Sequence, residues 1–204
     1  MSSTMLKAAI KEVSYYLKSP SENIEEETQK MVMKHALAAA ASAVAAGWLP
    51  GAGGMISVGI CLGFVWSMYY RLSGLFGIKI GKNLLKAIAS VVVAETAAYM
   101  VIVLTTATVL TFIPVLNIGA ATLCAIVNFG MVYIAGYLYI LMMTKLFKAG
   151  KDPNQLSEDE WKVVAKSTAD DVDMNAIYQE AKVVHKEVKD SEEYQDYKDV
   201  SPLE

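Results

Sequence analysis

Two long runs with almost no charge limit what this chain can fold into. The first run, from His35 to Tyr70, contains no Asp, Glu, Lys or Arg, and the second, from Ala87 to Thr144, contains Glu95 as its one charged residue. Apolar runs of this length are typical of buried or membrane-spanning helices, because a helix satisfies its own backbone hydrogen bonds. We therefore expect an all-α fold.

Proline and turn residues interrupt each run near its middle, and this predicts two apolar helical hairpins built from four main helices. The segment GWLPGAGG at 47–54 divides the first run, and Pro114 with Asn117 divides the second. Proline ends a helix, and glycine permits the dihedral angles of a tight turn. The predicted hairpin-tip residues are Pro50, Gly51, Gly53, Gly54, Pro114 and Asn117.

Small residues predict close packing of the two helices in the first hairpin. Gly59 and Gly63 form a GxxxG element, which lets helix backbones approach each other closely. Ser42 and Ala46 offer a small face on the preceding helix. We expect these four positions to form the helix contact.

The flanking regions are more polar. Leu6, Ile10, Val13 and Leu17 recur at helical spacing and predict an amphipathic helix over 4–18. Ser157 and Glu160 have the spacing of a capping box, which predicts the start of a soluble helix.

The expected organisation is therefore an amphipathic N-terminal region, a hydrophobic two-hairpin domain and an acidic soluble helical tail. Ser19 and Pro20 predict the start of the helix that enters the first apolar run. A further helix is expected over 173–189, with disorder in the last fifteen residues. The three regions are 1–30, 31–150 and 151–204.

The basic residues gather at the bases of the predicted hairpins. Residues 151–204 hold seven Lys and fifteen acidic residues, whereas 35–150 hold six Lys or Arg and one acidic residue. The positive-inside rule places such bases, and both termini, on the cytoplasmic face of the cytoplasmic membrane. A soluble cytoplasmic protein is the alternative. The predicted membrane-proximal basic residues are Arg71, Lys79, Lys82, Lys86, Lys145 and Lys148.

Segment length does not decide between a membrane and a buried core. A spanning helix needs about 20 apolar residues. The segments 88–113 and 118–144 are long enough, 55–70 is borderline, and 36–49 is too short. The first hairpin therefore spans, enters partly or is buried in protein.

No arrangement typical of an enzyme is present in the sequence. Glu95 is a candidate intramembrane charge, because an ionisable group in lipid is costly and is often functional. Its alternative is a place near the cytoplasmic base, within reach of water. His35 and His185 have no partner at catalytic or metal-ligand spacing, and Cys61 and Cys124 read as small core residues. We expect no cofactor, no metal and no nucleic acid.

The stretch AAAASAVAAGWLPGAGGMISVGICLGFVWSMYYRLSGLFG, followed by FIPVLNIGAATLCAIVNFGMVYIAGYLY, resembles a bacterial family of hydrophobic helical domains of unknown function. These domains are appended to small GTPase domains or stand alone. The similarity covers roughly 31–147 and includes Pro50, Gly77 and Pro114. The family's usual acidic residue after the first proline turn is absent, since Gly54 or Met55 stands there.

The resemblance implies a membrane-proximal module that works with a GTPase in trans, and it implies no hydrolase. Our leading hypothesis is a non-enzymatic helical membrane protein that acts as an interaction or membrane-organising module. Its partners would be membrane lipid, a GTPase or other protein, and further copies of itself. The alternatives are a pore-forming protein that inserts its hairpins and a soluble helical bundle that binds a partner or lipid.

Overall fold

The computed structural model describes residues 4–17, 21–46, 53–79, 81–99 and 117–189. These residues form helices and no strand, which confirms the all-α prediction. The helices are α1 (Thr4–Tyr16), α2 (Ile24–Ala46), α3 (Gly53–Leu75), α4 (Lys82–Tyr99), α6 (Asn117–Lys148), the 3₁₀ helix η2 (Pro153–Gln155), α7 (Glu158–Asp170) and α8 (Met174–Val188).

Several helix ends follow directly from local sequence. The predicted capping box is present, because the Ser157 side chain accepts from Glu160 N and the Glu160 carboxylate accepts from Ser157 N. The Asp173 side chain caps α8 by accepting from Ala176 N at 3.0 Å. Beyond α3 and α6, Gly77 and Gly150 adopt φ of 70° and 66°, a conformation that a side chain resists.

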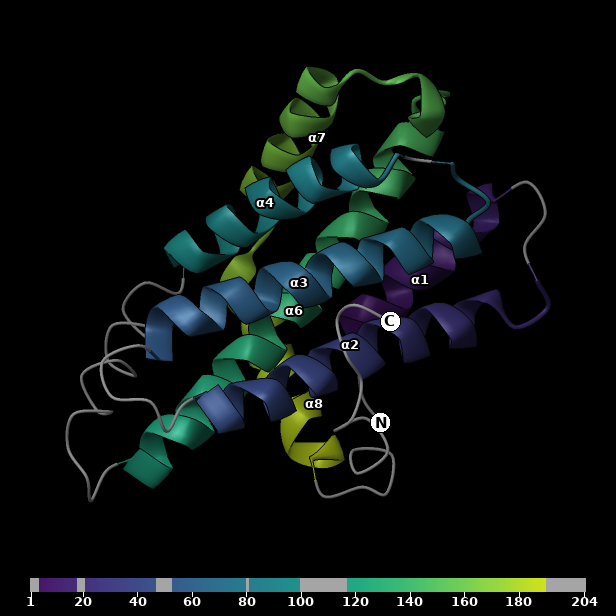
Figure 1. Cartoon of the computed structure of the whole chain (residues 1–204). Helices are drawn as coiled ribbons and strands as arrows, with labels where there is room; N and C mark the ends of the chain where they lie inside the picture. Colours follow the sequence, from purple (N-terminus) through teal and green to yellow (C-terminus); the bar gives the residue numbers. More distant parts are fainter. Residues whose placement is uncertain (1–3, 18–20, 47–52, 80, 100–116, 190–204) are drawn as a thin grey trace.

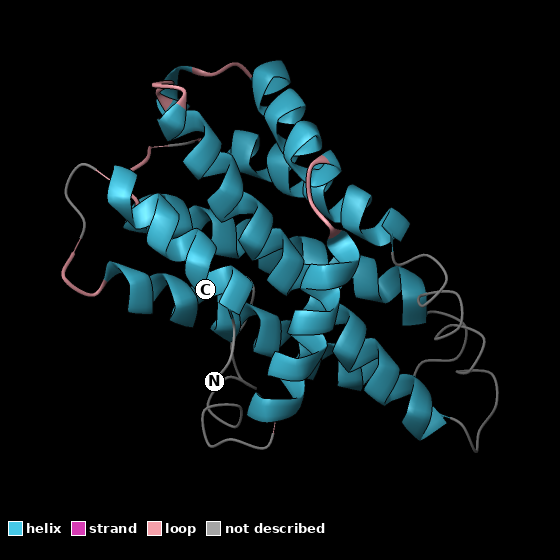
Figure 2. Ribbon diagram, turned by 180° about the vertical axis from the view of Figure 1, so that it is seen from behind, coloured by secondary structure: helices cyan, strands magenta, loops and turns pink. Residues whose placement is uncertain are grey.

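The long apolar helix α6 lies at the centre of the molecule. It contacts α1, α2, α3, α4, α7 and α8 (Figures 1 and 2). Its side chains from Met131 to Ala135 are all buried, and they belong to one hydrophobic core that also contains residues of the six surrounding helices. A helix that is apolar all round is stable in water only when it is enclosed in this way.

The described helix ends that flank the two interruptions lie at the same end of the molecule. The C-terminal end of α2, the N-terminal end of α3, the C-terminal end of α4 and the N-terminal end of α6 all point to the left in Figure 1. α2 packs against α3, and α4 packs against α6. Three of the six predicted tip residues lie outside the described residues, so the hairpin connections stay a prediction.

The described part of the chain corrects two features of the predicted tips. Gly53 and Gly54 form the start of α3 instead of a turn, and Asn117 is the first residue of α6. A helix accepts glycine in its first turn, where few backbone groups are yet constrained. Pro50, Gly51 and Pro114 lie outside the described residues.

The helix α4 also begins earlier than the end of the predicted basic connector. It starts at Lys82, so the connection after α3 covers only residues 76–81. Lys82 and Lys86 are therefore helical. Lysine is a good helix former, and charge alone does not exclude a residue from a helix.

The close helix approach lies at Gly136 and not at Gly59. A Cβ added to Gly136 would lie 2.8 Å from Val32 Cγ1 of α2 and 3.3 Å from Met68 Sδ of α3. Gly59 is exposed, and a Cβ there would meet nothing within 4 Å. Gly63 and Ser42 are half-buried, and the Ala46 side chain is not described. Gly59 therefore does not form a tight contact, and the predicted packing of Gly63, Ser42 and Ala46 stays a prediction.

Three polar helices, α1, α7 and α8, surround the later part of α6, and we call them the polar collar. Tyr133 of α6 donates to Glu180 Oε1 of α8 at 2.7 Å. Lys145 pairs with Asp171 at 2.8 Å, and Lys148 pairs with Glu12. The centroid of the Phe129 ring lies 4.9 Å from that of the His185 ring of α8. These contacts place the collar beside the part of α6 that begins at Phe129.

Glu180 joins the collar helices to one another. Its carboxylate accepts from Met5 N at 2.9 Å and from Leu6 N at 3.2 Å, in addition to Tyr133. The N-terminal N–H groups of a helix lack intrahelical partners, and a carboxylate there is stabilised by the helix dipole. One side chain of α8 therefore fixes both the start of α1 and the middle of α6.

Candidate functional site

One end of the molecule is almost free of charge, and we call it the apolar end. It consists of residues 36–44 of α2, 58–66 of α3, 88–98 of α4 and 121–128 of α6. Among these described residues Glu95 is the one charged side chain. The collar contacts α6 at Phe129 and at Lys145, and α7 also packs against α4.

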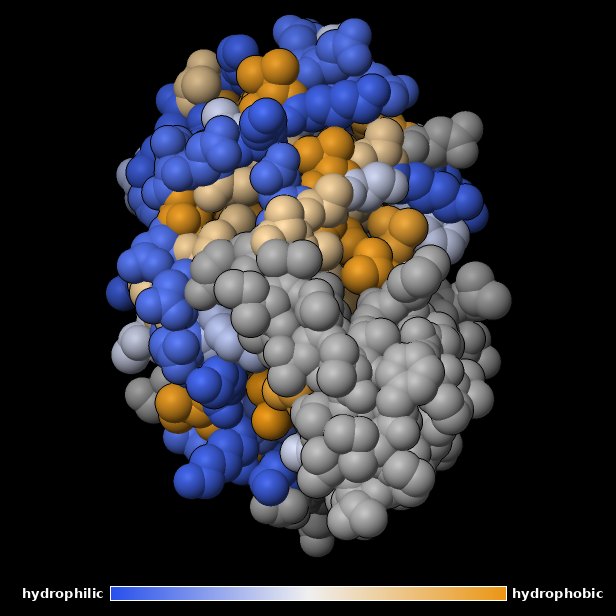
Figure 3. Space-filling model, turned by 90° about the vertical axis from the view of Figure 1, so that its left-hand side faces the viewer, coloured by the Kyte–Doolittle hydropathy of each residue, from blue (hydrophilic) through white to orange (hydrophobic). Residues whose placement is uncertain are grey.

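Apolar and small side chains reach the surface of the apolar end. Val44 and Leu62 are each 36% exposed. Ala94 and Ala98, one turn apart on α4, are exposed as well. Figure 3 looks at this end, and apolar residues in orange and tan gather beside the grey atoms, with hydrophilic residues in blue around them. Charge is missing here although water is accessible, which is unusual for a soluble surface.

The depth of the apolar end can be estimated from helix rise. From residue 88 to residue 98 α4 advances by ten residues, or about 15 Å at 1.5 Å per residue. From residue 121 to residue 128 α6 advances by seven residues, or about 10 Å. The described apolar end is thus about as deep as one leaflet's hydrocarbon, about 15 Å, and shallower than the full core of about 30 Å.

The structure divides the predicted membrane-proximal basic residues into two groups. Lys145 and Lys148 of α6 pair with the collar carboxylates of Asp171 and Glu12. On α4, Lys86 Nζ lies 4.7 Å from the centroid of the Trp66 ring, and Lys82 Nζ lies 5.2 Å from that of Tyr70. Arg71 is half-buried and Lys79 is exposed. No ion pair with another described residue is formed by Arg71, Lys79, Lys82 or Lys86.

Glu95 lies within the apolar end and not at its base. It is half-buried, nine residues beyond Lys86 and four before the end of α4. A half-buried carboxylate keeps some contact with water, so an intramembrane charge and a place within reach of water both stay predictions for Glu95.

Asn128 and Cys61 of the apolar end and the neighbouring His35 have local partners for their polar groups, whereas the buried Nε1 of Trp66 has none among the described residues. Asn128 Nδ2 donates to Cys124 O at 2.8 Å, and Cys61 Sγ donates to Asn128 Oδ1 at 3.0 Å. His35 Nδ1 lies 2.8 Å from Met31 O. Burial lowers the pKa of His35 to about 4. These groups hold helices together in a neutral state, and none forms a nucleophile–base arrangement.

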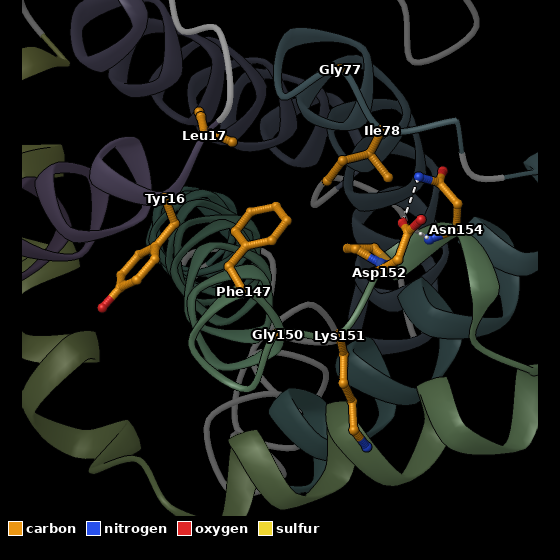
Figure 4. A pocket seen from close by; sticks show the side chains of 10 residues that line it. Tyr16, Leu17, Gly77, Ile78, Phe147, Gly150, Lys151, Asp152 and Asn154 are labelled. Atoms are coloured by element: carbon orange, nitrogen blue, oxygen red, sulfur yellow. Dashed lines mark hydrogen bonds between the residues drawn. The ribbon is translucent and has the colours of Figure 1, made fainter.

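A cavity of about 340 Å³ opens at the opposite end of the molecule (Figure 4). Tyr16, Leu17, Ile78 and Phe147 supply most of its apolar lining. Its polar groups serve the local fold: Asp152 Oδ1 accepts from Asn154 N at 2.9 Å, and Asn154 Oδ1 accepts from Lys79 N at 2.8 Å. No histidine or cysteine is among the described lining residues.

Within the described ranges, no group of three His, Cys, Asp or Glu residues is placed to hold a metal ion. One described helix, Ala121–Lys148, is long and apolar enough to cross a membrane, and most of it is buried inside the protein. The central helix of a soluble bundle has the same length and composition, so this alone is weak support for insertion.

Comparisons with protein-family models, with curated proteins and with solved structures found no match. The class that the fold defines is an all-helical protein with one apolar end and a polar collar.

Proposed function

We propose that this chain is a non-enzymatic, membrane-associated helical module that inserts its apolar end into one leaflet. The observation that carries the proposal is the absence of charge, apart from Glu95, over four neighbouring helix segments with exposed apolar side chains. Burial of apolar area in lipid is favourable by roughly 25 cal/mol per Å². The polar collar would stay in water.

Partial insertion agrees with the dimensions better than a spanning α6 does. The part of α6 after Phe129 is enclosed by helices that carry charged groups, such as Glu158, Lys162 and Lys182. These groups cannot enter hydrocarbon without a large free-energy cost. For α6 to span the membrane, the collar would first have to leave it.

The biological role that fits such a module is interaction or membrane organisation at the cytoplasmic face. A GTPase partner in trans rests on the sequence resemblance. Association of several copies on the membrane is also compatible with the exposed small residues of α3 and α4.

Fractionation and vesicle flotation test the proposal together. We expect the protein to sediment with membranes and to float with neutral phosphatidylcholine vesicles. Introducing lysine at Leu62 should abolish flotation, because a cation would then face hydrocarbon. Introducing lysine at Val163, which is 67% exposed on the collar, is the matched control and should have no effect. If the protein instead stays in the supernatant without detergent and does not bind vesicles, the result would support a soluble helical bundle.

A second candidate is a pore-forming protein, and the burial of α6 favours it. A helix of spanning length that is hidden by a polar collar is what a soluble, insertion-competent protein requires. Leakage of vesicle contents tests this function. Glu180→Gln should increase leakage if the collar must be released, because Glu180 holds α8 to α1 and α6. Flotation without leakage in both proteins would favour the first function.

A further inference from the structure

Two exposed lysines on α4 lie over aromatic rings of α3. Lys86 lies over Trp66 and Lys82 over Tyr70, and the two pairs are one helical turn apart on both helices. A cation over an aromatic face is attracted by the ring quadrupole, which orients the lysine along the helix pair. The two pairs therefore lie next to each other and form a double row of lysines and aromatic rings.

The two ammonium groups have no carboxylate partner among the described residues. Lys30, Lys145, Lys148 and Lys162 all form ion pairs there. Lys82 and Lys86 are exposed and have cation–π contacts only. Their charge is thus available to an anion outside the protein.

The double row lies at the border between the apolar end and the charged part of the molecule. On α3, the row Leu62, Trp66 and Tyr70 follows one face at intervals of four residues. On α4, Lys82, Lys86, Ser90, Ala94 and Ala98 follow one face at the same interval and are all exposed. Along α3 this face changes from aliphatic to aromatic, and along α4 it changes from small to cationic, so the aromatic rings and the cations lie side by side.

We propose that Lys82 and Lys86 bind the phosphate groups of anionic phospholipids, with Trp66 and Tyr70 at the level of the headgroups. The inference rests on the proposed function, because insertion of the apolar end brings this row to the membrane surface. Tyr and Trp prefer that level, and lysine extends its ammonium from an apolar surface toward phosphate. The charge of an anionic leaflet is complementary to that of the two lysines, and this is why we infer that lipid binds at the double row.

The proposal predicts a preference for anionic vesicles that depends on these two lysines. Each lysine near an anionic surface contributes about 1 kcal/mol, so Lys82→Gln with Lys86→Gln should weaken binding to phosphatidylglycerol-containing vesicles roughly 30-fold. Binding to neutral phosphatidylcholine vesicles should be unchanged. The charge-conserving variant Lys82→Arg with Lys86→Arg should keep the preference, and high salt should reduce it.

A matched control removes the same charge from the collar. Lys166 and Lys182 are exposed, and Lys182 also lies over an aromatic ring, that of Tyr178 at 5.7 Å. Lys166→Gln with Lys182→Gln should leave the anionic preference intact. Circular dichroism and thermal unfolding should be unchanged in all variants, since the four lysines are on the surface.

Three results would overturn the inference. Undiminished anionic preference in the Lys82 and Lys86 variant, with normal neutral binding, would reject the lipid site and leave the proposed function standing. If Lys166→Gln with Lys182→Gln weakened binding to anionic vesicles equally, the preference would come from the net charge of the protein and not from a lipid site at Lys82 and Lys86. Failure of the parent protein to bind either vesicle would reject the proposed function as well, and would leave a protein partner as the occupant of this face.

Discussion

At the scale of single residues, the polar atoms that the fold buries divide into satisfied and unsatisfied groups. Thr144 Oγ1 donates to Ile140 O at 2.9 Å. Thr168, on the buried face of α7, has no hydrogen-bond partner for Oγ1 in the described part of the chain. A buried hydroxyl without a partner costs free energy, because it has lost its bonds to water.

Thr168→Val should therefore stabilise the protein. The replacement keeps the shape and removes the unsatisfied hydroxyl, so the free energy of unfolding should rise by about 1 kcal/mol. Urea denaturation measures this change. Thr144→Val is the control and should be neutral or destabilising, since it removes an existing hydrogen bond. A loss of stability in Thr168→Val would show that the hydroxyl is satisfied.

His35 should make the folded state sensitive to acid. Burial lowers the pKa of His35 to about 4, with Arg71 and Lys34 acting in the same direction against the hydrogen bond to Met31. An unfolded histidine has a pKa of about 6.5. As the pH falls from about 6.5 to about 4, His35 binds a proton in the unfolded chain but stays neutral in the folded protein. The free energy of unfolding therefore decreases over this pH range.

The expected loss is about 3 kcal/mol, from about 1.4 kcal/mol per pKa unit. Urea denaturation at neutral and acidic pH should show a steeper loss for the parent than for His35→Gln. Other groups titrate in the same range, and the difference between the two proteins isolates His35. If the stability of the parent and of His35→Gln falls in parallel with pH, His35 takes up its proton in the folded state as readily as in the unfolded state.

Glu95 should oppose membrane binding. It lies half-buried within the apolar end, where an ionised carboxylate must lose water on insertion. Glu95→Gln should strengthen binding to neutral vesicles several-fold, and Glu187→Gln, on the exposed surface of α8, should not. Weaker binding by Glu95→Gln would assign Glu95 a favourable contact at the membrane.

At the scale of helices, the tight crossing of α2, α3 and α6 depends on Gly136. Gly136→Ala should destabilise the protein by about 1–3 kcal/mol, because the new methyl group would overlap the buried Val32 side chain. Gly59→Ala is the matched control. It should be neutral or stabilising by up to about 1 kcal/mol, since the site is open and alanine favours the helix. Equal effects of the two changes on thermal unfolding would contradict this assignment.

Local signals predicted some helix ends, such as the start of α7, whereas contacts between helices could not be predicted. The start that Ser19 and Pro20 predict is wrong, because residues 21–23 are not helical and α2 begins at Ile24. The capping box at Ser157 and Glu160 involves neighbouring residues, so its geometry follows from sequence spacing. The choice of Gly136 over Gly59 depends on which faces meet, and both glycines lie in apolar helices with similar surroundings in sequence. The contacts of the polar collar could not be predicted from the sequence either, because Glu180 contacts Met5, which is 175 residues away along the chain.

At the scale of the whole molecule, the charge pattern predicted an apolar end but not how the polar regions close around α6. The two runs, which hold Glu95 as their one charged residue, supply the four segments 36–44, 58–66, 88–98 and 121–128 of this end. The expectation that Lys145 and Lys148 face a membrane did not include their ion pairs with Asp171 and Glu12. Ion pairs between residues that are far apart in the sequence leave no local pattern. The sequence alone therefore predicts residues 151–204 as a separate soluble region.

The most direct test of the central claim is the depth of two labels in neutral vesicles. A fluorophore on Leu62→Cys reports on the apolar end, and one on Val163→Cys reports on the collar; Cys61 and Cys124 are buried and should not react. We predict that nitroxide lipids quench the label at 62 and leave the label at 163 in water. Vesicle-bound protein with both labels quenched, or with neither quenched, would contradict insertion of the apolar end beneath a polar collar.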